Sequence, residues 1–351
     1  MSNWMIYGAY GYTGVLVAEE ALKRGHTPIL AGRSADKLIP LAERLNLPHK
    51  VFGLDDPATI ESALDGVDVV YHAAGPFVHT SDPMIRACIN TNTHYLDITG
   101  EYPVFENTFS YDEQAKAAGI ALISGVGFDV VPTDCAAKHV VNRLPDADKL
   151  EIGFAAIGTM SAGTAKSAIG LMGSGGKIRR DGDLIPFPMG KGARTINFYD
   201  KPRTALPITW GDLSTAYRST GVPNITTYMA FPKAVANMMG TFGGVSSAMM
   251  SSELVRGVLR KMVDWTVTGP DENTRNTATS HVWAKATNPA GEGAETWIET
   301  IEAYHYTALI GVRSVEQMLD SAVTGTSTPS LAFGVDFVLE VEGTQRFDSK
   351  P

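Results

Sequence analysis

The chain has 351 residues, of which 44% are hydrophobic and 19% charged, so it can form two domains with apolar cores. Its formal net charge of -9 argues against nucleic acid as a partner, because binding phosphates requires a basic surface. The two cysteines, Cys88 and Cys135, form neither a disulfide framework nor a recognised metal-ligand spacing, so no metal site is predicted.

Targeting signals are also not expected. No basic and apolar leader precedes the first predicted strand, which starts at about residue 4. No run reaches the roughly 18 consecutive apolar residues that a membrane span requires. We therefore expect a cytoplasmic protein.

A glycine-rich turn lies between the first predicted strand, Trp4-Met5-Ile6-Tyr7, and an apolar-periodic helix that stops at Gly25. Glycines at a spacing of three allow a tight turn and a close approach of the backbone to a pyrophosphate. The positive end of the following helix then faces the phosphates. The turn predicts a dinucleotide site that includes Gly8, Tyr10, Gly11, Tyr12, Thr13 and Gly14.

The second predicted strand, residues 27–32, ends at Arg33 and Ser34, where the ribose of the cofactor is read. An arginine there accommodates a 2′-phosphate, whereas an NAD site usually presents an acidic residue. Arg33, Ser34 and Lys37 therefore indicate NADPH. Lys37 fits a solvated helix face equally well. Asp55, beyond the third strand, fits either an adenine contact or a turn.

The alternation of strand and helix continues to residue 124, which predicts a Rossmann-type doubly wound parallel sheet. Further strands are expected at residues 51–54, 67–72, 94–98 and 120–124, with a helix over 104–118. Small-residue loops follow three of these strands and meet at one edge of the sheet. They predict cofactor contacts at Ala73, Ala74, Gly75, Pro76, Phe77, Thr99, Gly100, Gly127 and Phe128.

A nicotinamide at these loops leaves the protein to supply a proton. The catalytic candidates are Asp129, Asp97 and Tyr102, and Glu101 and Asp134 are further acids nearby. Asp129 ranks first, because its loop follows the sixth strand. For Asp97 and Asp129, accepting backbone N–H bonds that fix their loops ranks above proton donation. A backbone group, a water molecule or another tyrosine stays open as the donor.

Four motifs, in this order, resemble the saccharopine dehydrogenase-like oxidoreductases: Gly8 to Gly14, Ala74 to Phe77, Tyr95 to Glu101 and Gly127 to Asp134. The most similar branch includes the trans-acting enoyl reductases. The tail, at residues 300–308 and 325–330, is similar to the last strand-helix segment of the family. The resemblance implies an NAD(P)-binding Rossmann domain, a second domain and a C-terminal return to the first.

A competing family is excluded by its proton-transfer residues. Short-chain dehydrogenases have a similar glycine turn but depend on a Tyr-x-x-x-Lys pair. None of the twelve tyrosines here is followed by lysine four positions later. We therefore reject that mechanism.

Beyond residue 133 the pattern changes to alternating strands at 150–157, 279–286 and 296–304, which predicts an α+β domain with a mainly antiparallel sheet. Asp181-Gly182 and Lys191-Gly192 predict hairpin turns. A helix is expected from Ser161 to about Met172, with an N-terminus that fits a simple cap or a substrate carbonyl. The predicted domains are residues 1–133, residues 134–310 and a C-terminal helical segment over 311–351.

Residues 228–265 hold six of the thirteen methionines, followed by the basic side chains of Arg256, Arg260 and Lys261. Methionine adapts to irregular apolar surfaces, so this segment fits an apolar ligand, a hydrophobic partner or peripheral contact with an anionic membrane. A flexible core or a dimer interface explains it equally simply. A homodimer is expected.

The predicted function is NADPH-dependent transfer of hydride to an apolar, lipid-like unsaturated substrate, with C=C reduction ahead of C=O. An opine or imine reductase acting on C=N is the alternative, and its carboxylate-rich substrate requires converging arginines. The available ones are Arg179, Arg180, Arg194, Arg203 and Arg218. A non-catalytic NADPH-binding scaffold is a second alternative.

Overall fold

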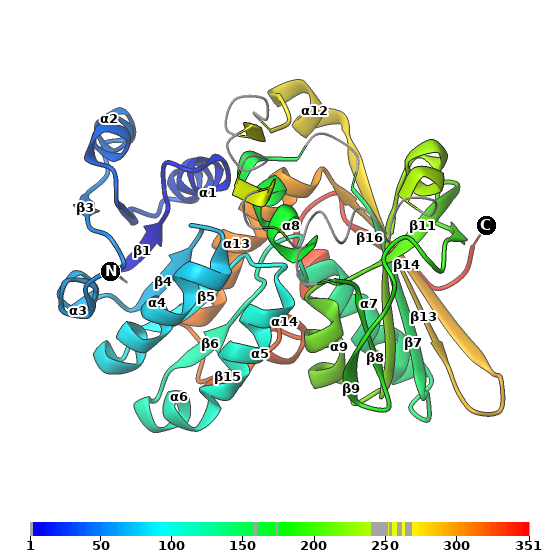
Figure 1. Ribbon diagram of the computed structural model, residues 1–351. Helices are drawn as coiled ribbons and strands as arrows, with labels where there is room; N and C mark the ends of the chain where they lie inside the picture. The colour runs from blue at the N-terminus through cyan, green and yellow to red at the C-terminus, as the bar shows by residue number, and fades with distance from the viewer. Residues whose placement is uncertain are drawn as a thin grey trace.

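The protein contains two β-sheets that lie side by side (Figure 1). The computed structural model describes residues 3–156, 160–172, 175–239, 252, 255–257, 262–263 and 269–350. The α/β class with a parallel and a mainly antiparallel sheet, predicted from the sequence, is confirmed. No helix in these ranges is long and apolar enough to cross a membrane.

The first sheet has seven parallel strands in the order β15-β6-β5-β4-β1-β2-β3. They are β1 (Trp4–Tyr7), β2 (Ile29–Gly32), β3 (His49–Val51), β4 (Val69–His72), β5 (His94–Asp97), β6 (Ala121–Ile123) and β15 (Gly325–Ser327). The strand order reverses between β1 and β4, so ligands are expected at the carboxyl ends of these two strands.

Helices cover both faces of this sheet and form an apolar core on each side. They are α1 (Tyr12–Lys23), α2 (Ala35–Leu45), α3 (Pro57–Leu64), α4 (Phe77–Thr91), α5 (Tyr102–Ser110) and α6 (Asp112–Ala118). The single helix expected over 104–118 is therefore wrong. The chain turns at Tyr111, whose hydroxyl donates to the Asp82 carboxylate on α4 at 2.7 Å.

The C-terminal part returns to both sheets. Helix α13 (Ala303–Leu319) packs against α1 and β4, and the close approach to the Tyr71 ring requires a glycine at position 311. The predicted boundary between residues 310 and 311 falls inside this helix, which continues the first domain. The tail is also not only helical, because α14 (Pro329–Ala332) and the 3₁₀ helix η1 (Phe337–Glu340) are flanked by β15 and β16 (Gln345–Phe347).

The second sheet follows the order β10-β11-β12-β7-β13-β14-β16, and β8 pairs with β12 and β9. Its strands are β7 (Lys149–Ala155), β8 (Lys177–Arg180), β9 (Asp183–Pro186), β10 (Arg194–Asn197), β11 (Pro202–Ile208), β12 (Asn224–Ala230), β13 (Thr279–Thr287), β14 (Gly293–Ile301) and β16. All pairs are antiparallel except β12 with β7. The expected turn at Asp181-Gly182 joins β8 to β9. The hairpin expected at Lys191-Gly192 is wrong, because β10 pairs with β11 and not with β9.

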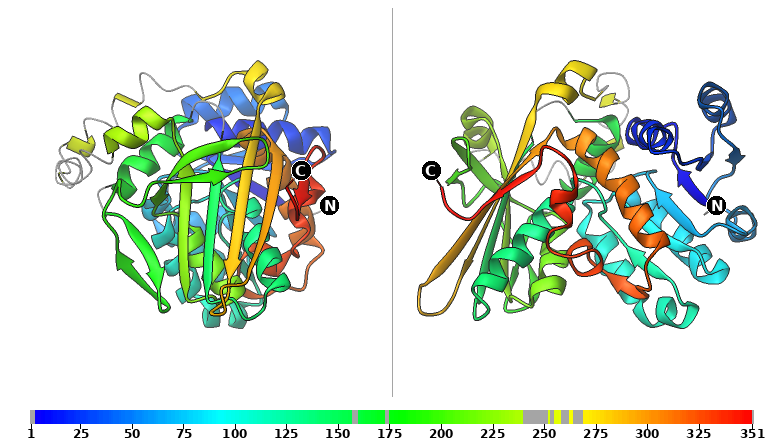
Figure 2. Two further views of the ribbon diagram at one scale, coloured as in Figure 1. Left: turned by 90° about the vertical axis from the view of Figure 1, so that its right-hand side faces the viewer. Right: turned by 180° about the vertical axis from the view of Figure 1, so that it is seen from behind.

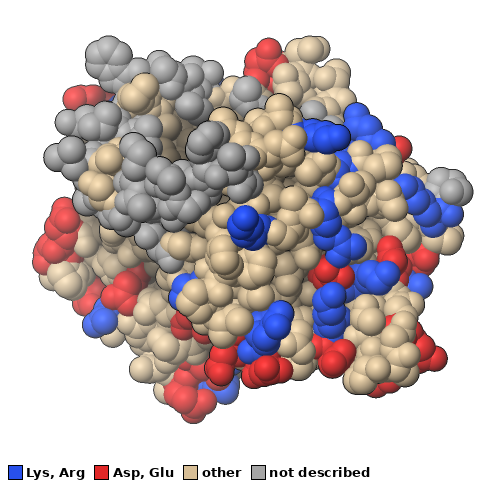
Figure 3. Space-filling view, turned by 45° about the vertical axis from the view of Figure 1, so that its right-hand side comes forward, with Lys and Arg blue, Asp and Glu red and all other residues tan. Residues whose placement is uncertain are grey.

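Helices α7 (Val131–Arg143) and α9 (Asp212–Thr220) cover the inner face of this sheet, and its strands lie in front of them when the sheet is viewed from outside (Figure 2). On the outer face, basic and acidic side chains are interspersed (Figure 3), as in the pairs of Arg194 with Glu151 and Lys285 with Glu295. Helix α8 (Ala162–Met172) lies between the two sheets, and α12 (Glu272–Thr277) lies above it (Figure 1).

Candidate functional site

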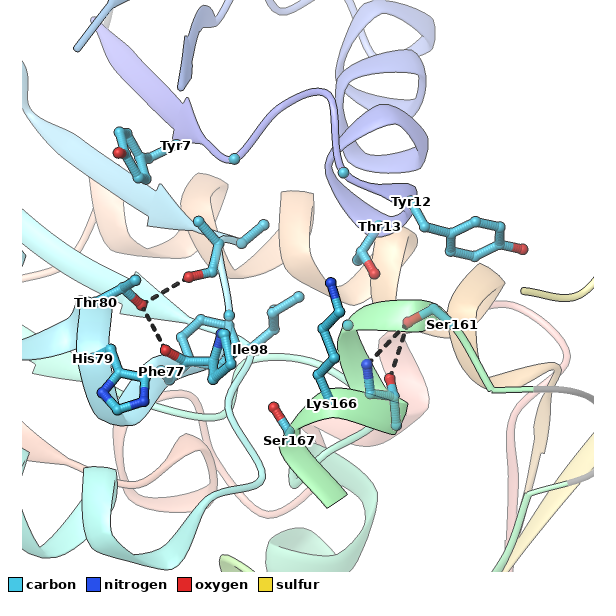
Figure 4. Close-up of a pocket in the computed structure, with 18 of the residues that line it drawn as sticks. Tyr7, Tyr12, Thr13, Phe77, His79, Thr80, Ile98, Ser161, Lys166 and Ser167 are labelled. Atoms are coloured by element: carbon cyan, nitrogen blue, oxygen red, sulfur yellow. Dashed lines mark hydrogen bonds between the residues drawn. The ribbon is translucent and has the colours of Figure 1, made fainter. Parts of the chain in front are cut away.

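A cavity of about 730 Å³ opens at the carboxyl ends of β1 and β4 and extends to α8 and Trp210 of the second domain (Figure 4). The cavity therefore lies where the strand order reverses, and this is where the sequence predicts a dinucleotide site. The predicted site residues that line it are Gly8, Tyr10, Gly11, Tyr12, Thr13, Arg33, Lys37, Asp55, Ala73, Ala74, Gly75, Pro76, Phe77, Gly100 and Asp129.

The glycine turn forms a backbone cradle at one side of this cavity. Gly8 has a φ of +87°, and a Cβ there would lie 2.8 Å from the Ala74 nitrogen. A Cβ on Gly14 would lie 2.4 Å from the Gly8 carbonyl oxygen, so Gly14 packs α1 onto the turn and does not line the cavity. Helix α1 has neither a side-chain cap nor an acidic residue in its first turn. Its positive end is therefore suited to a pyrophosphate.

The end of β2 carries positive charge. Arg33 and Lys37 both line the cavity, and the Lys37 ammonium lies 6.0 Å from the centre of the Tyr10 ring. The Tyr10 ring in turn lies against Gly32, where a Cβ would come within 2.5 Å of it. Ser34 begins α2 without a side-chain cap and is not part of the cavity wall. The two cations fit a 2′-phosphate.

The loop from Ala73 to Phe77 continues the wall from β4 to α4. The Thr80 hydroxyl donates to the Ala74 carbonyl oxygen at 2.7 Å and also contacts that of Pro76 at 3.3 Å, which ties the loop to the first turn of α4 (Figure 4). At the N-terminus of α4, the Glu101 carboxylate accepts the backbone N–H groups of Phe77 and Val78 at 3.1 and 3.0 Å. This buried carboxylate, one of the further acids expected near the loops, lines the cavity.

Asp97 holds the loops together from outside the cavity. Its carboxylate accepts the backbone N–H groups of Thr99 and Gly125 and the hydroxyls of Tyr95 and Ser124, at 2.8 to 3.0 Å. Burial raises the pKa of Asp97 to about 6, and these hydrogen bonds oppose the shift. The geometry supports the structural role that ranked first for Asp97.

Four other predicted residues lie away from the cavity wall, which corrects their assignment. Tyr102 begins α5, with the Lys177 ammonium 5.3 Å from its ring centre. The Thr99 hydroxyl accepts the Glu101 backbone N–H. A Cβ on Gly127 would meet Thr307 of α13, whose hydroxyl accepts the Phe128 N–H at 2.9 Å. The Phe128 ring packs in the core against Phe154 and Tyr306.

Asp129, the first-ranked acid, lines the cavity, and the residue is partly accessible. Burial by the surrounding protein raises the pKa of Asp129 to about 7, and a hydrogen bond from the Trp210 side chain opposes the shift. Near neutral pH, a substantial fraction of this carboxyl therefore holds a proton. Because Trp210 comes from the second domain, the acid lies where the two domains meet.

The N-terminus of helix α8, for which the sequence left a simple cap and a substrate contact open, lies at the cavity, together with α8 residues that were not predicted as site residues. Ser161, Thr164 and Ser167 all line the cavity. The Ser161 N–H donates to the Tyr304 hydroxyl at 2.6 Å, and the Thr164 hydroxyl lies 2.9 Å from the same oxygen. Hydroxyl residues at a spacing of three along one helix were the available signal in the sequence. Further cavity residues that were missed are Tyr7, Gly32, Gly53, Leu54, His79, Thr80, Ile98, Ala162, Gly163, Lys166 and Trp210.

The doubly wound sheet, the glycine cradle and the basic end of β2 define a dinucleotide-binding domain, and a second domain completes the wall of the cavity. Comparison with known proteins identifies it further. Residues 4–123 match the Saccharopine dehydrogenase NADP binding domain. NADP(H) is therefore the cofactor, and the cradle and cations described above fit it.

Similar proteins lie in the same group. A saccharopine dehydrogenase-like oxidoreductase from Bos taurus is 28% identical over 214 residues, which cover 53% of this chain and 50% of the bovine protein. A trans-acting enoyl reductase from Mycobacterium ulcerans (strain Agy99) is 32% identical over 149 residues, 40% of this chain and 35% of the reductase. The chain thus spans half or less of the length of these relatives.

Saccharopine dehydrogenase (L-Glu forming) from Saccharomyces cerevisiae shares the fold, with a TM-score of 0.66 and 10% identity over 99% of this chain and 100% of that chain. The resemblance to the saccharopine dehydrogenase-like oxidoreductases is confirmed, and the first domain is an NADP-binding domain of that type.

Proposed function

We propose that this protein is an NADPH-dependent oxidoreductase that reduces an unsaturated bond of an apolar substrate, C=C ahead of C=O. The observation that carries this proposal is the lining of the cavity beyond the glycine cradle. Ile98, Ala162 and Trp210 contribute apolar side chains to a part of the wall that also holds the acids Asp129 and Glu101. The trans-acting enoyl reductases among the relatives support a lipid-like substrate.

The positions of the arginines favour this substrate over a carboxylate-rich one. Arg179, Arg194 and Arg203 are paired with Glu106, Glu151 and Asp200. Arg180 and Arg218 also lie off the cavity wall. Among the described residues that line the cavity, Arg33 is the arginine. A substrate with several carboxylates requires converging guanidinium groups and is disfavoured by the carboxyls of Glu101 and Asp129.

Asp129 would supply the proton in this reaction. When bound, NADPH supplies hydride to one carbon of the double bond. The Asp129 carboxyl gives its proton to the other carbon, the π bond is lost, and the carboxylate regains a proton from solvent. The Trp210 side chain lines the same cavity and lowers the pKa of this carboxyl. The hydroxyls of Ser161 and Thr164 are further donors in the same cavity.

A preference for NADPH over NADH is part of the proposal. Arg33 follows β2 directly and Lys37 lies one helical turn further on, so both can face a 2′-phosphate. The name of the matched domain, an NADP-binding domain, supports the same preference.

Reduction of C=N remains the second candidate, because Glu101 and Asp129 line the same cavity and suit a protonated imine.

The test of the proposed function is a single-turnover measurement of NADPH oxidation by conjugated enones or enoyl thioesters, by imino acids and by lipid carbonyls. We expect oxidation with the first group and loss of most of the rate in Asp129→Asn, with exposed Asp320→Asn as the control. Turnover with imino acids alone contradicts the proposal, and no turnover with any group favours a scaffold.

We further propose that the protein is cytoplasmic, contacts membranes peripherally and forms a homodimer. The Met160, Met238 and Met262 side chains are 50%, 58% and 57% exposed, and apolar exposed side chains suit a lipid surface. Most of the methionine-rich segment 228–265 lies outside the described residues. Liposome flotation of the wild type and of a variant without the charges of Arg256, Arg260 and Lys261 tests the contact, which is refuted if neither protein floats. Light scattering after size-exclusion chromatography tests the dimer.

A further inference from the structure

Lys166 belongs to α8 of the second domain, yet it reaches the cofactor side of the cavity. Its side chain lines the cavity and points toward Thr13, in the first turn of α1 (Figure 4). Thr13 lines the same cavity. Residue 166 lies well beyond residues 4–123, which match the NADP-binding domain. The glycine motif therefore gives no indication of this lysine.

The electrostatics of α1 favour an anion between these two residues. The N-cap Gly11 has no side chain to satisfy the free N–H groups, and the first turn contains no acidic residue. The positive end of α1 is thus not neutralised by its own side chains. A lysine ammonium that points at this end places a second positive group beside it, and an anion between them interacts favourably with both. In this cavity the pyrophosphate is the anion expected beside α1.

The direction of Lys166 is built into the structure by the residues beside it. The Ser167 hydroxyl donates to the Glu101 carboxylate, and the Thr164 hydroxyl contacts that of Tyr304. Glu101 belongs to the first domain, and the Tyr304 ring meets the Tyr12 ring of the glycine turn edge-on at 5.0 Å. Because α8 is held on both sides of Lys166, the helix backbone at position 166 is anchored beside the turn.

We propose that Lys166 binds the pyrophosphate of NADP(H), so that the second domain completes the cofactor site. This role does not depend on which substrate is reduced. The pyrophosphate is common to NADPH and NADH, so loss of the Lys166 charge weakens both cofactors equally. Arg33 faces the 2′-phosphate in the proposed site, so its loss affects NADPH alone. Measurements of cofactor binding, without any turnover, therefore distinguish the role of Lys166 from that of Arg33.

The test is a fluorescence titration of NADPH, NADH and 2′-AMP, which carries the 2′-phosphate without a pyrophosphate. In Lys166→Gln we expect Kd to rise about tenfold for both dinucleotides, as for loss of one charge-assisted contact, and 2′-AMP binding to stay unchanged. Lys166→Arg should restore most of the affinity, which also shows that position 166 tolerates substitution. Lys285→Gln, on the second sheet and paired with Glu295, is the control and should bind as wild type.

Three results would overturn the proposal. If Lys166→Gln leaves the Kd values of both dinucleotides unchanged, Lys166 has another role. The same holds if only the KM for the substrate rises. Weakening of NADPH and 2′-AMP with NADH unchanged places it at the 2′-phosphate. Equal weakening in Lys166→Arg and Lys166→Gln shows that its charge is not the cause. These titrations measure cofactor binding alone, so they test the role of Lys166 even if the proposed reduction does not occur.

Discussion

The hydroxyl of Ser167 on α8 donates to the Glu101 carboxylate at 2.5 Å, which joins the second domain to the N-terminus of α4 in the first. The same carboxylate accepts two backbone N–H groups of α4. One buried carboxylate thus links the nucleotide-binding domain to α8 of the second domain. This contact leads to the first of four predictions.

Ser167→Ala should destabilise the protein, because it removes a hydrogen bond to a buried carboxylate. Hydrogen bonds to charged groups contribute about 1.5 to 3 kcal/mol, so the free energy of unfolding should fall by about that amount. Ser167→Thr keeps the hydroxyl and should lose less. Urea unfolding at neutral pH measures both, with the exposed Ser110→Ala as the control. Equal stability of Ser167→Ala and wild type would show that this contact contributes nothing.

Arg33→Asp should reverse the cofactor preference. The change removes a cation from the proposed 2′-phosphate site and adds an acid that suits a free 2′-hydroxyl. We expect the Kd for NADPH to rise at least about tenfold, equivalent to about 1.4 kcal/mol, with a much smaller change for NADH. Arg44→Gln, which breaks the exposed pair with Glu19, is the control. Equal losses for the two cofactors would refute a 2′-phosphate role for Arg33.

Gly14→Ala should disrupt the cofactor cradle. Its Cβ would lie 2.4 Å from the Gly8 carbonyl oxygen and 2.8 Å from the Ala9 Cα, so α1 must shift away from the turn. Such overpacking costs about 1 to 3 kcal/mol. We expect a lower melting temperature and loss of NADPH binding by calorimetry. Gly163→Ala provides the comparison, because the nearest described atom to its Cβ is the Ser161 Oγ at 3.7 Å, and it should not destabilise the fold.

The stability that Asp212 and Asp129 contribute should fall as pH rises from about 4 to about 7. Burial raises the pKa of Asp212 to about 7 and that of Asp129 to about 7, from a usual value of 3.8. The folded state therefore holds protons that the unfolded state has lost in this range. The stability contributed by these groups is complete below the unfolded pKa and is lost as pH passes the folded pKa, by about 1.4 kcal/mol per pH unit for each group.

Asp212→Asn isolates one of these groups. Asp212 is fully buried, and neither carboxyl oxygen has a hydrogen-bond partner among the residues that the structure describes. The neutral asparagine should flatten the pH dependence of the unfolding free energy and make the variant more stable than wild type at pH 8. Chemical denaturation from pH 4 to 8 measures the slope. An unchanged slope would mean that Asp212 does not titrate in this range.

Much of the nucleotide site was predictable because its residues are neighbours along the chain. A glycine turn between a strand and a helix has a local geometry, so Gly8, Gly11 and Gly14 suffice to predict the cradle. Arg33 was predictable for the same reason, since it directly follows β2. The loop after β4 also followed from its small residues at a strand end.

The part of the cavity wall that the second domain supplies was not predictable, because its contacts join residues far apart in sequence. Ser167 meets Glu101 across 66 positions, and the Phe128 N–H meets Thr307 across 179. The second contact puts Gly127 and Phe128 in the core and not at the cofactor. The sequence by itself determined that a dinucleotide binds at the carboxyl ends of β1 and β4, since periodicity and turn chemistry are local. Only the packing of the two domains decided that Asp129, Trp210 and Lys166 share one cavity, because burial and charge there depend on side chains from both.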